Sequence, residues 1–175
     1  MDLGSRIMIL GSAGSGKSTL ATQLSKITGV QVIHLDRFFW NPGWVQTPGD
    51  EMDEKVLNAA SQDSWIIDGN YFRTLDIRLQ RASCVIFIDF NKYLCLYRII
   101  KRRFQNRGKT RHDMAEGCPE KLDMPFLKWV WNYPEHSRPI ILTNIDEACK
   151  DKVTIIIKNQ KELKALLEKV ERALP

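Results

Sequence analysis

Cysteine and histidine are scarce in this sequence and are not arranged as metal ligands. The chain contains four cysteines and three histidines, and neither set shows the paired spacing of a zinc site. The cysteines form no disulfide framework of the secreted type, so we expect free thiols. A zinc protein and a small disulfide-stapled domain are therefore not expected. The residues concerned are Cys84, Cys95, Cys118, Cys149, His34, His112 and His136.

Long hydrophobic runs are also missing. No apolar stretch approaches the ~20 residues of a membrane-spanning helix, and no positively charged leader with a cleavage site precedes the first apolar run. We therefore expect a cytoplasmic protein without a membrane segment. The 43% hydrophobic content is sufficient for one domain with a substantial core, and no repeat divides the chain.

Acidic residues are absent from one stretch that is rich in cations. Lysine and arginine together number 26 against 21 acids, which gives a net charge of +5. Seven cations lie between Arg98 and Arg111 with no acid among them, so the rest of the chain is slightly acidic. The basicity is therefore one local cluster. Its members are Arg98, Lys101, Arg102, Arg103, Arg107, Lys109 and Arg111.

An octapeptide near the N-terminus is the most specific motif in the chain. The apolar run Ile7–Leu10 leads into Gly-Ser-Ala-Gly-Ser-Gly-Lys-Ser at 11–18, and a helical pattern follows over 18–28. This is the strand, loop and helix of a phosphate-binding P-loop, in which backbone N–H groups cradle phosphates. Lys17 would reach the terminal phosphates and Ser18 would hold Mg²⁺. The predicted ATP-binding residues are Gly11, Ser12, Ala13, Gly14, Ser15, Gly16, Lys17, Ser18 and Thr19.

Short apolar runs alternate with helical patterns along the chain. This alternation predicts an α/β fold, with a parallel sheet covered by helices on both faces. The strands are expected at 6–10, 31–35, 65–67, 84–88 and 153–157. Helices are expected at 18–28, 49–62, 71–81, 92–106, 120–131, 138–150 and 160–173. The segment 41–49 is rich in turn residues and predicts a loop, and 108–119 predicts a mobile flap.

Aspartates follow three of the expected strands. Ligands of open α/β sheets bind beyond the carboxyl ends of the strands, so these acids are candidates for magnesium and substrate chemistry. Asp68 closes the third run and would orient Mg²⁺ together with Ser18. Asp36 closes the second run and would bind or activate the acceptor, because a carboxylate can take the proton of a hydroxyl nucleophile. A capping or turn role is the alternative for both.

Aromatic residues follow Asp36 directly. Phe39, Trp40 and the nearby Trp44 would lie beside the acceptor pocket and stack on a flat ring, although aromatics in such a place are more often core or loop anchors. Asp36 with its following aromatics resembles the catalytic acid of P-loop kinases that phosphorylate a hydroxyl, such as the nucleoside and shikimate kinases.

The cationic cluster lies on an expected helix. Helical spacing places Arg98 and Arg102 on neighbouring turns of one face. Repulsion between like charges destabilises such a helix, which favours a polyanionic ligand. This cluster has three explanations. The arginines close over the triphosphate, or the helix binds nucleic acid, or its charged face is solvated and has no ligand. We favour the first, in which Arg98, Arg102 and Arg103 are the favoured members of the cluster and Arg98 and Arg102 stabilise the transferring phosphoryl group.

Several segments together resemble a known family. The stretch 68–74, Asp-Gly-Asn-Tyr-Phe-Arg-Thr, resembles the Asp-Gly-Phe-Pro-Arg-Thr segment of adenylate kinases, which implies that Arg73 binds acceptor phosphate. The cationic helix resembles the lid of nucleoside monophosphate kinases. With the P-loop at 11–18 and the tracts 33–36 and 94–121, the chain resembles DNA topology modulation proteins, a branch of the adenylate-kinase-like P-loop kinases.

The resemblance implies a five-stranded parallel sheet in the order 2-3-1-4-5, ATP with Mg²⁺ as donor, and a small acceptor. We also expect a single domain, 1–175, with a core at about 1–97 and 140–175 and a lid region at about 98–119. The preferred hypothesis is an ATP-dependent kinase acting on a nucleoside, nucleotide or similar small metabolite. The alternatives are a nucleotide-regulated DNA-associated protein and an ATPase without a small acceptor. Asp36 favours a hydroxyl acceptor and Arg73 a phosphate, and oligomeric state is left open.

Overall fold

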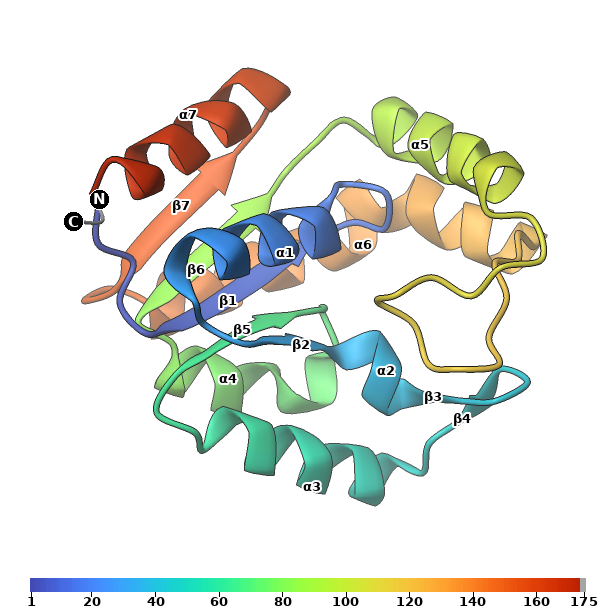
Figure 1. Ribbon diagram of the computed structural model, residues 1–175, viewed down its shortest axis with the longest axis horizontal. Helices are drawn as coiled ribbons and strands as arrows, with labels where there is room; N and C mark the ends of the chain where they lie inside the picture. The colour runs from blue at the N-terminus through green and yellow to red at the C-terminus, as the bar shows by residue number, and fades with distance from the viewer. Residues whose placement is uncertain (174–175) are drawn as a thin grey trace.

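Helices cover both faces of a central sheet in the computed structural model, which describes residues 1–173 (Figure 1). The sheet has five parallel strands in the order β2-β5-β1-β6-β7. The α/β class and the strand order 2-3-1-4-5 are therefore confirmed. The strands are β1 (Arg6–Gly11), β2 (Val32–His34), β5 (Trp65–Asp68), β6 (Cys84–Ile88) and β7 (Val153–Ile157).

The helices form the two outer layers. They are α1 (Lys17–Thr28), α2 (Leu35–Phe39), α3 (Gly49–Ala60), η1 (Phe72–Thr74), α4 (Leu75–Arg81), α5 (Lys92–Gln105), α6 (Met124–Ala148) and α7 (Gln160–Glu171). One apolar cluster joins one face of the sheet to α3, α4 and α6, and a second joins the other face to α1, α5 and α7. Alternate residues of β1 supply both clusters, because successive side chains of a strand point to opposite faces. Met8 and Leu10 enter the first, and Ile7 and Ile9 the second.

The second half of the chain contains one long helix where the sequence predicts two. Helix α6 replaces the expected helices 120–131 and 138–150, and Pro134 and Pro139 lie inside it. Each proline removes a backbone donor and disfavours a helix locally. Tertiary packing outweighs that preference here, because one face of the helix is buried along most of its length. The buried residues are Val130, Tyr133, Ser137, Ile141 and Ile145.

The expected loop at 41–49 contains a small antiparallel hairpin. Strand β3 (Trp40–Asn41) pairs with β4 (Val45–Gln46), and residues 42–44 form the turn. Gly43 and Trp44 both have positive φ angles, of 80° and 65°. The turn-rich segment 41–49 therefore includes a β-hairpin. Glycine in its turn is typical of such hairpins, because the turn requires positive φ angles. The short helix α2, which holds Asp36, was not expected either.

The membrane prediction and the cysteine prediction concern the chain as a whole. Among residues 1–173, no helix is long and apolar enough to cross a membrane. All four cysteines are buried and free, as expected. The last two residues of the expected core range, 174 and 175, lie outside the described part of the chain.

Candidate active site

The P-loop follows β1 and ends on the first turn of α1. Gly11, Gly14 and Gly16 have φ angles of 146°, 76° and 102°, which side chains with a Cβ rarely adopt. A Cβ at Gly14 would also collide with the carbonyl of Cys95 at the start of α5. The glycines therefore allow the loop to bend tightly and to pack against α5.

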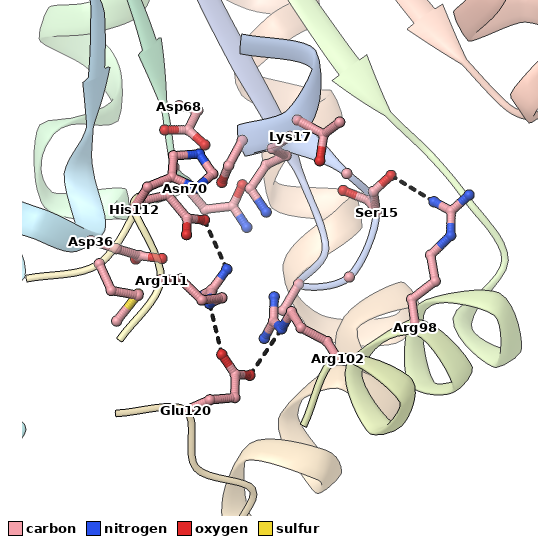
Figure 2. Close-up of a pocket in the computed structure, with 18 of the residues that line it drawn as sticks. Ser15, Lys17, Asp36, Asp68, Asn70, Arg98, Arg102, Arg111, His112 and Glu120 are labelled. Atoms are coloured by element: carbon pink, nitrogen blue, oxygen red, sulfur yellow. Dashed lines mark hydrogen bonds and ion pairs between the residues drawn. The ribbon is translucent and has the colours of Figure 1, made fainter. Parts of the chain in front are cut away.

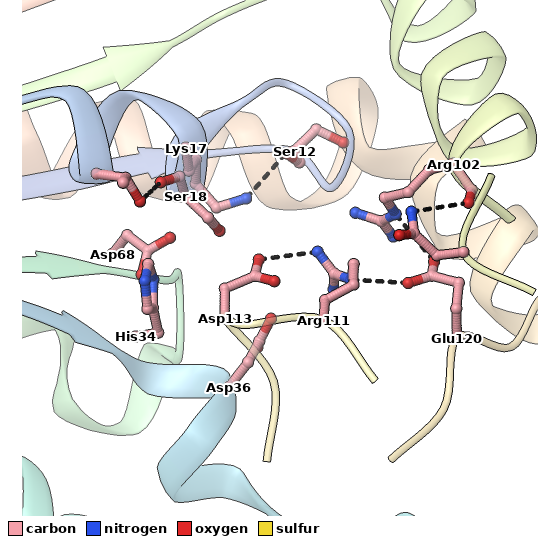
Figure 3. Close-up of polar contacts among 12 residues, drawn as sticks. Ser12, Lys17, Ser18, His34, Asp36, Asp68, Arg102, Arg111, Asp113 and Glu120 are labelled. Atoms are coloured by element: carbon pink, nitrogen blue, oxygen red, sulfur yellow. Dashed lines mark hydrogen bonds and ion pairs between the residues drawn. The ribbon is translucent and has the colours of Figure 1, made fainter. Parts of the chain in front are cut away.

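Polar atoms of this loop are buried and available to a ligand. The hydroxyls of Ser12 and Ser15 are buried and have no hydrogen-bond partner among the described residues. Lys17 Nζ folds back and donates to the Ser12 carbonyl at 2.9 Å (Figure 3). Burial lowers the pKa of Lys17, and the carboxylates of Asp68 and Asp36 oppose that shift. Buried donors without partners are costly, so this loop fits the phosphates of a nucleotide.

Asn70 holds the start of the P-loop in place. Its side-chain amide accepts a hydrogen bond from the Gly11 N–H at 3.1 Å and donates one to the Gly11 carbonyl at 3.0 Å. Asn70 comes from the turn after β5 and lines the same cavity as the loop. No sequence motif marks Asn70 for this role, because a local pattern does not link residues that are far apart in the chain.

Asp68 lies at the end of β5, beside the P-loop. It is opposite His34 of β2 in the strand register, and His34 Nδ1 lies 2.7 Å from Asp68 Oδ1. Both side chains are buried. Burial works to lower the pKa of His34, but the hydrogen bond and charge of Asp68 outweigh it, so the pKa is raised. His34 therefore orients the carboxylate that the sequence predicts as a magnesium ligand.

A second carboxylate approaches the P-loop from the lid region. Asp113 is buried, and Arg111 Nη1 donates to it at 2.8 Å. Burial works to raise the pKa of Asp113, but Arg111 and the Ser18 hydroxyl outweigh it and the pKa is lowered. Asp113 is thus an ionised acid beside Ser18 (Figure 3). The sequence signal for it was weak, since it is only the first acid after the cationic cluster.

The residues present fit a magnesium ion held partly by nucleotide. No group of three or more His, Cys, Asp or Glu side chains within 1–173 could hold a metal alone. Magnesium in nucleotide sites binds one or two carboxylates and takes its other oxygens from phosphates and water. Ser18, Asp68 and Asp113 supply that kind of oxygen donor set at the P-loop.

Asp36 lies on α2 and points into the cavity (Figure 2). The Tyr71 hydroxyl donates to Asp36 Oδ1 at 2.6 Å. Burial raises the pKa of Asp36, and the hydrogen bond from Tyr71 acts in the opposite direction. A carboxylate with a raised pKa is a better proton acceptor, which suits the role that the sequence predicts.

Arginines cover the cavity from α5 and the lid region (Figure 2). Arg98 donates to the Ser15 carbonyl at 3.1 Å and to Gln160 at 2.9 Å, so it connects the P-loop to α7. Arg102 Nε donates to Glu120 at 2.9 Å, and Arg111 Nε lies 2.7 Å from the other oxygen of Glu120. Burial lowers the pKa of Arg102, and the charge of Arg111 acts in the same direction. Two guanidinium groups therefore converge on one buried carboxylate above the P-loop.

One cavity of about 1370 Å³ brings most of these residues together. A site for one drug-sized ligand usually has roughly 300–1,000 Å³, so this cavity has room for a nucleotide and an acceptor. Gly11 and Ser12 are not among the residues that line it. The sequence-predicted residues that line it are Ala13, Gly14, Ser15, Gly16, Lys17, Ser18, Thr19, Asp36, Phe39, Trp40, Asp68, Arg98 and Arg102.

Arg73 does not line the cavity, which corrects the expectation drawn from the adenylate-kinase-like segment. Its guanidinium donates to Asp50 and Asp53 of α3, at 2.8 Å each, on the exposed side of the molecule. The turn η1, together with the extra residue in Asn-Tyr-Phe, carries Arg73 toward the acidic first turn of α3. The structure does not support Arg73 as an acceptor-binding residue.

Solved structures of two kinds of kinase have this fold. A shikimate kinase from Acinetobacter baumannii in complex with shikimate has a TM-score of 0.64 and 15% identity, covering 97% of this chain and 92% of that one. The shikimate kinase of Bacteroides thetaiotaomicron has a TM-score of 0.56 and 16% identity, with 97% of each chain covered. A gluconokinase from Sinorhizobium meliloti 1021 has a TM-score of 0.54 and 13% identity, covering 99% and 97%.

Sequence comparison finds a relative whose identity to this chain is also low. The uncharacterized protein YqaC of Bacillus subtilis (strain 168) is 26% identical over 129 residues, which are 73% of this chain and 71% of that protein. No protein-family model matches the chain. The chain therefore has the P-loop α/β fold of shikimate kinase and gluconokinase, and the narrower resemblance to DNA topology modulation proteins is not confirmed.

Proposed function

We propose that this protein is a magnesium-dependent and ATP-dependent phosphotransferase that acts on a nucleoside, nucleotide or similar small metabolite. The observation that carries the proposal is the shared cavity, in which the P-loop, Asp36 and the arginines of α5 and the lid region face one another. Phosphoryl transfer needs mainly positioning and charge stabilisation, and these groups supply both. The kinases among the solved structures of this fold support the same reaction class.

The donor half of the site is the P-loop with α1. Its backbone N–H groups, the hydroxyl of Ser15 and the ammonium of Lys17 would hold the phosphates of ATP. Ser18, Asp68 and Asp113 would hold Mg²⁺, which when bound neutralises charge on the phosphate oxygens. Arg102 and Arg111 would contact the transferring group once they exchange Glu120 for phosphate oxygens.

The acceptor half of the site contains Asp36. Its carboxylate would take the proton of the acceptor hydroxyl while the acceptor oxygen bonds to the γ-phosphorus. The bond from that phosphorus to the bridging oxygen of ADP breaks in the same step. Tyr71 holds one oxygen of Asp36 at 2.6 Å, which leaves the other free for the acceptor.

Turnover of Lys17→Ala tests the proposal. Because the P-loop lysine would contact the terminal phosphates directly, we expect this variant to lose nearly all ATP-dependent product formation, by about 10²-fold or more. Lys26→Ala is the matched control, since Lys26 is an exposed lysine on the same helix. We expect it to keep the activity of the unmodified protein. Equal turnover in the two variants would refute the assignment.

A DNA-associated function is the second candidate. It corresponds to the resemblance of the sequence to DNA topology modulation proteins. Three cations of the cluster, Lys101, Arg103 and Arg107, do not line the cavity and are available to a polyanion. Binding to duplex DNA would then weaken steeply as salt rises, because each neutralised phosphate releases counterions. A filter-binding titration measures that slope. Absence of binding near physiological salt would remove this candidate.

An ATPase without a small acceptor is the remaining alternative. It predicts ATP hydrolysis whose rate no added metabolite increases. A screen of nucleosides, nucleoside monophosphates and hydroxylated metabolites, with identification of any new phosphorylated product, separates it from the phosphotransferase.

A further inference from the structure

Four aromatic rings form one wall of the cavity beside Asp36. The ring centroids of Phe39 and Trp40 lie 4.8 Å apart, those of Phe39 and Tyr71 also 4.8 Å, and those of Trp40 and Trp44 5.2 Å. All four residues line the cavity and none is fully buried. Tyr71 also donates its hydroxyl to Asp36, so the wall and the acid are adjacent. We call this part of the cavity the acceptor compartment.

The hairpin that carries Trp44 is held against the lid region. Gly43 N–H donates to the Gly117 carbonyl at 3.0 Å, and Trp44 Nε1 donates to the Pro119 carbonyl at 3.2 Å. Cys118 Sγ donates to the Asn41 carbonyl at 3.2 Å. Trp44 has a φ angle of 65°, which a bulky residue adopts only where its surroundings enforce it. Contacts with the lid region therefore hold the hairpin, and with it Trp44 of the aromatic wall, in place.

Two cations beside this compartment, Arg111 and Lys121, have carboxylate partners. Arg111 contacts both Asp113 and Glu120. Lys121 lies 3.6 Å from Asp123 and 4.8 Å above the Trp44 ring. Lys109 lines the cavity without a carboxylate partner among residues 1–173, but it is exposed to solvent, where ion pairs contribute little.

Arg73, the residue that would suit a phosphorylated acceptor, is directed away to α3. Asp36 receives its hydrogen bond from the neutral hydroxyl of Tyr71 and has no cation partner within 4 Å among the described residues. The cations whose charges act on Asp36 are Lys17 and Arg111, and the proposed function assigns both to the phosphates of ATP. An anionic acceptor in this compartment would therefore meet the Asp36 carboxylate without a remaining cation to offset it.

We infer that the acceptor is an uncharged alcohol with a planar ring of nucleoside size, and not a phosphorylated or carboxylated molecule. The inference rests on the proposed phosphotransferase function and names its substrate class. The planar ring packs on Trp40 and Trp44, and its hydroxyl faces Asp36. The hydroxyl oxygen forms the bond to the γ-phosphorus, the proton passes to Asp36, and ADP leaves with the electrons of the broken bond.

Matched acceptors that differ in charge test the inference. At saturating ATP and Mg²⁺, product formation is followed by phosphorus NMR with adenosine and its 5′-monophosphate, and with thymidine and its 5′-monophosphate. Pyridoxine extends the set of uncharged ring alcohols, and shikimate and gluconate represent carboxylated alcohols. We expect at least one uncharged ring alcohol to have a kcat/KM at least about tenfold above every anionic acceptor.

The possible outcomes separate the inference from the proposed function. An anionic acceptor that is used as well as the uncharged ring alcohols, or better, overturns the inference and leaves the phosphotransferase standing. ATP hydrolysis that yields no phosphorylated acceptor overturns both. Loss of anionic turnover in Lys109→Ala would identify Lys109 as the anion-binding residue and would also overturn the inference.

Variants of Trp40 test the aromatic wall. With the uncharged ring alcohol, we expect Trp40→Ala to raise KM at least about tenfold while kcat stays within about twofold. Trp40→Phe should restore most of the affinity and checks that the alanine variant does not simply misfold. Trp131→Ala is the matched control, because Trp131 is exposed on α6 and does not line the cavity. An unchanged KM in both Trp40 variants would overturn the role of the wall.

Discussion

Arg78 is the residue whose position links the two halves of the site. It is fully buried, and burial lowers its pKa to about 9. It has no carboxylate partner among the described residues and donates instead to backbone carbonyls. The acceptors are Thr74 at 3.1 Å, Gly69 at 2.8 Å, Asn70 at 2.6 Å and Tyr71 at 2.7 Å. Arg78 thereby fixes the turn that carries both Asn70 and Tyr71.

Replacement of Arg78 by leucine should therefore destabilise the protein strongly. Arg78→Leu leaves several buried carbonyls without donors, so we expect a loss of about 2–5 kcal/mol in the free energy of unfolding. Arg81→Leu, on the exposed end of the same helix, should cost less than about 1 kcal/mol. Urea denaturation measures both. Similar losses in the two variants would contradict the role given to Arg78.

Single residues differ in how far the sequence could predict their roles. The motif around Lys17 is local, and Asp36 and Asp68 follow apolar strands, so pattern alone located them. Asn70 and Asp113 act through contacts with segments more than fifty residues away along the chain. Arg73 could not be placed, because its direction depends on the acids that α3 presents to it.

At the scale of elements, the contact between the hairpin and the lid region depends on a close approach at Gly117. Gly117 has a φ angle of 74°, and a Cβ there would lie 2.9 Å from the Pro42 Cβ. Gly108 has nearly the same φ angle, 73°, but has open space around it. Replacement of either glycine by alanine would therefore strain the backbone to a similar degree. Only at Gly117 would the added Cβ also collide with a neighbouring residue.

This difference gives a matched experiment. Gly117→Ala and Gly108→Ala should each cost about 1 kcal/mol of stability from the positive φ angle. Only Gly117→Ala should also displace the hairpin, so we expect its acceptor KM to rise several-fold while the KM for ATP stays unchanged. Steady-state kinetics with each substrate varied in turn measures this. The same acceptor KM in both variants would show that the hairpin contact does not shape the acceptor compartment.

Elements were easier to predict from the sequence than their ends and connections. The five parallel strands follow from apolar runs of the length expected for buried strands. Helix α6 continues through Pro134 and Pro139 because its buried face packs against the core. Local sequence patterns do not reveal such tertiary packing. The hairpin β3–β4 was missed because its strands are only two residues long.

For the whole molecule, nucleotide binding should appear as added stability. A ligand present at 100 times its Kd stabilises the folded state by about 2.7 kcal/mol, which raises Tm by roughly 5–10 °C in a domain of this size. We expect this shift with ATP and Mg²⁺, a smaller shift when EDTA removes the metal, and nearly none in Lys17→Ala. Thermal denaturation followed by circular dichroism gives all three values. A full shift in Lys17→Ala would contradict phosphate binding by the P-loop.

In the proposed function, one cavity holds both the donor and the acceptor for phosphoryl transfer. The most direct test uses ATP labelled with phosphorus-32 at the γ-position, together with an uncharged ring alcohol that the acceptor screen identifies. We expect label to appear in the acceptor in a one-to-one ratio with ADP, and Asp36→Asn to slow this transfer while ATP still binds. Label found only in inorganic phosphate, at a rate that no acceptor changes, would contradict phosphoryl transfer in this cavity.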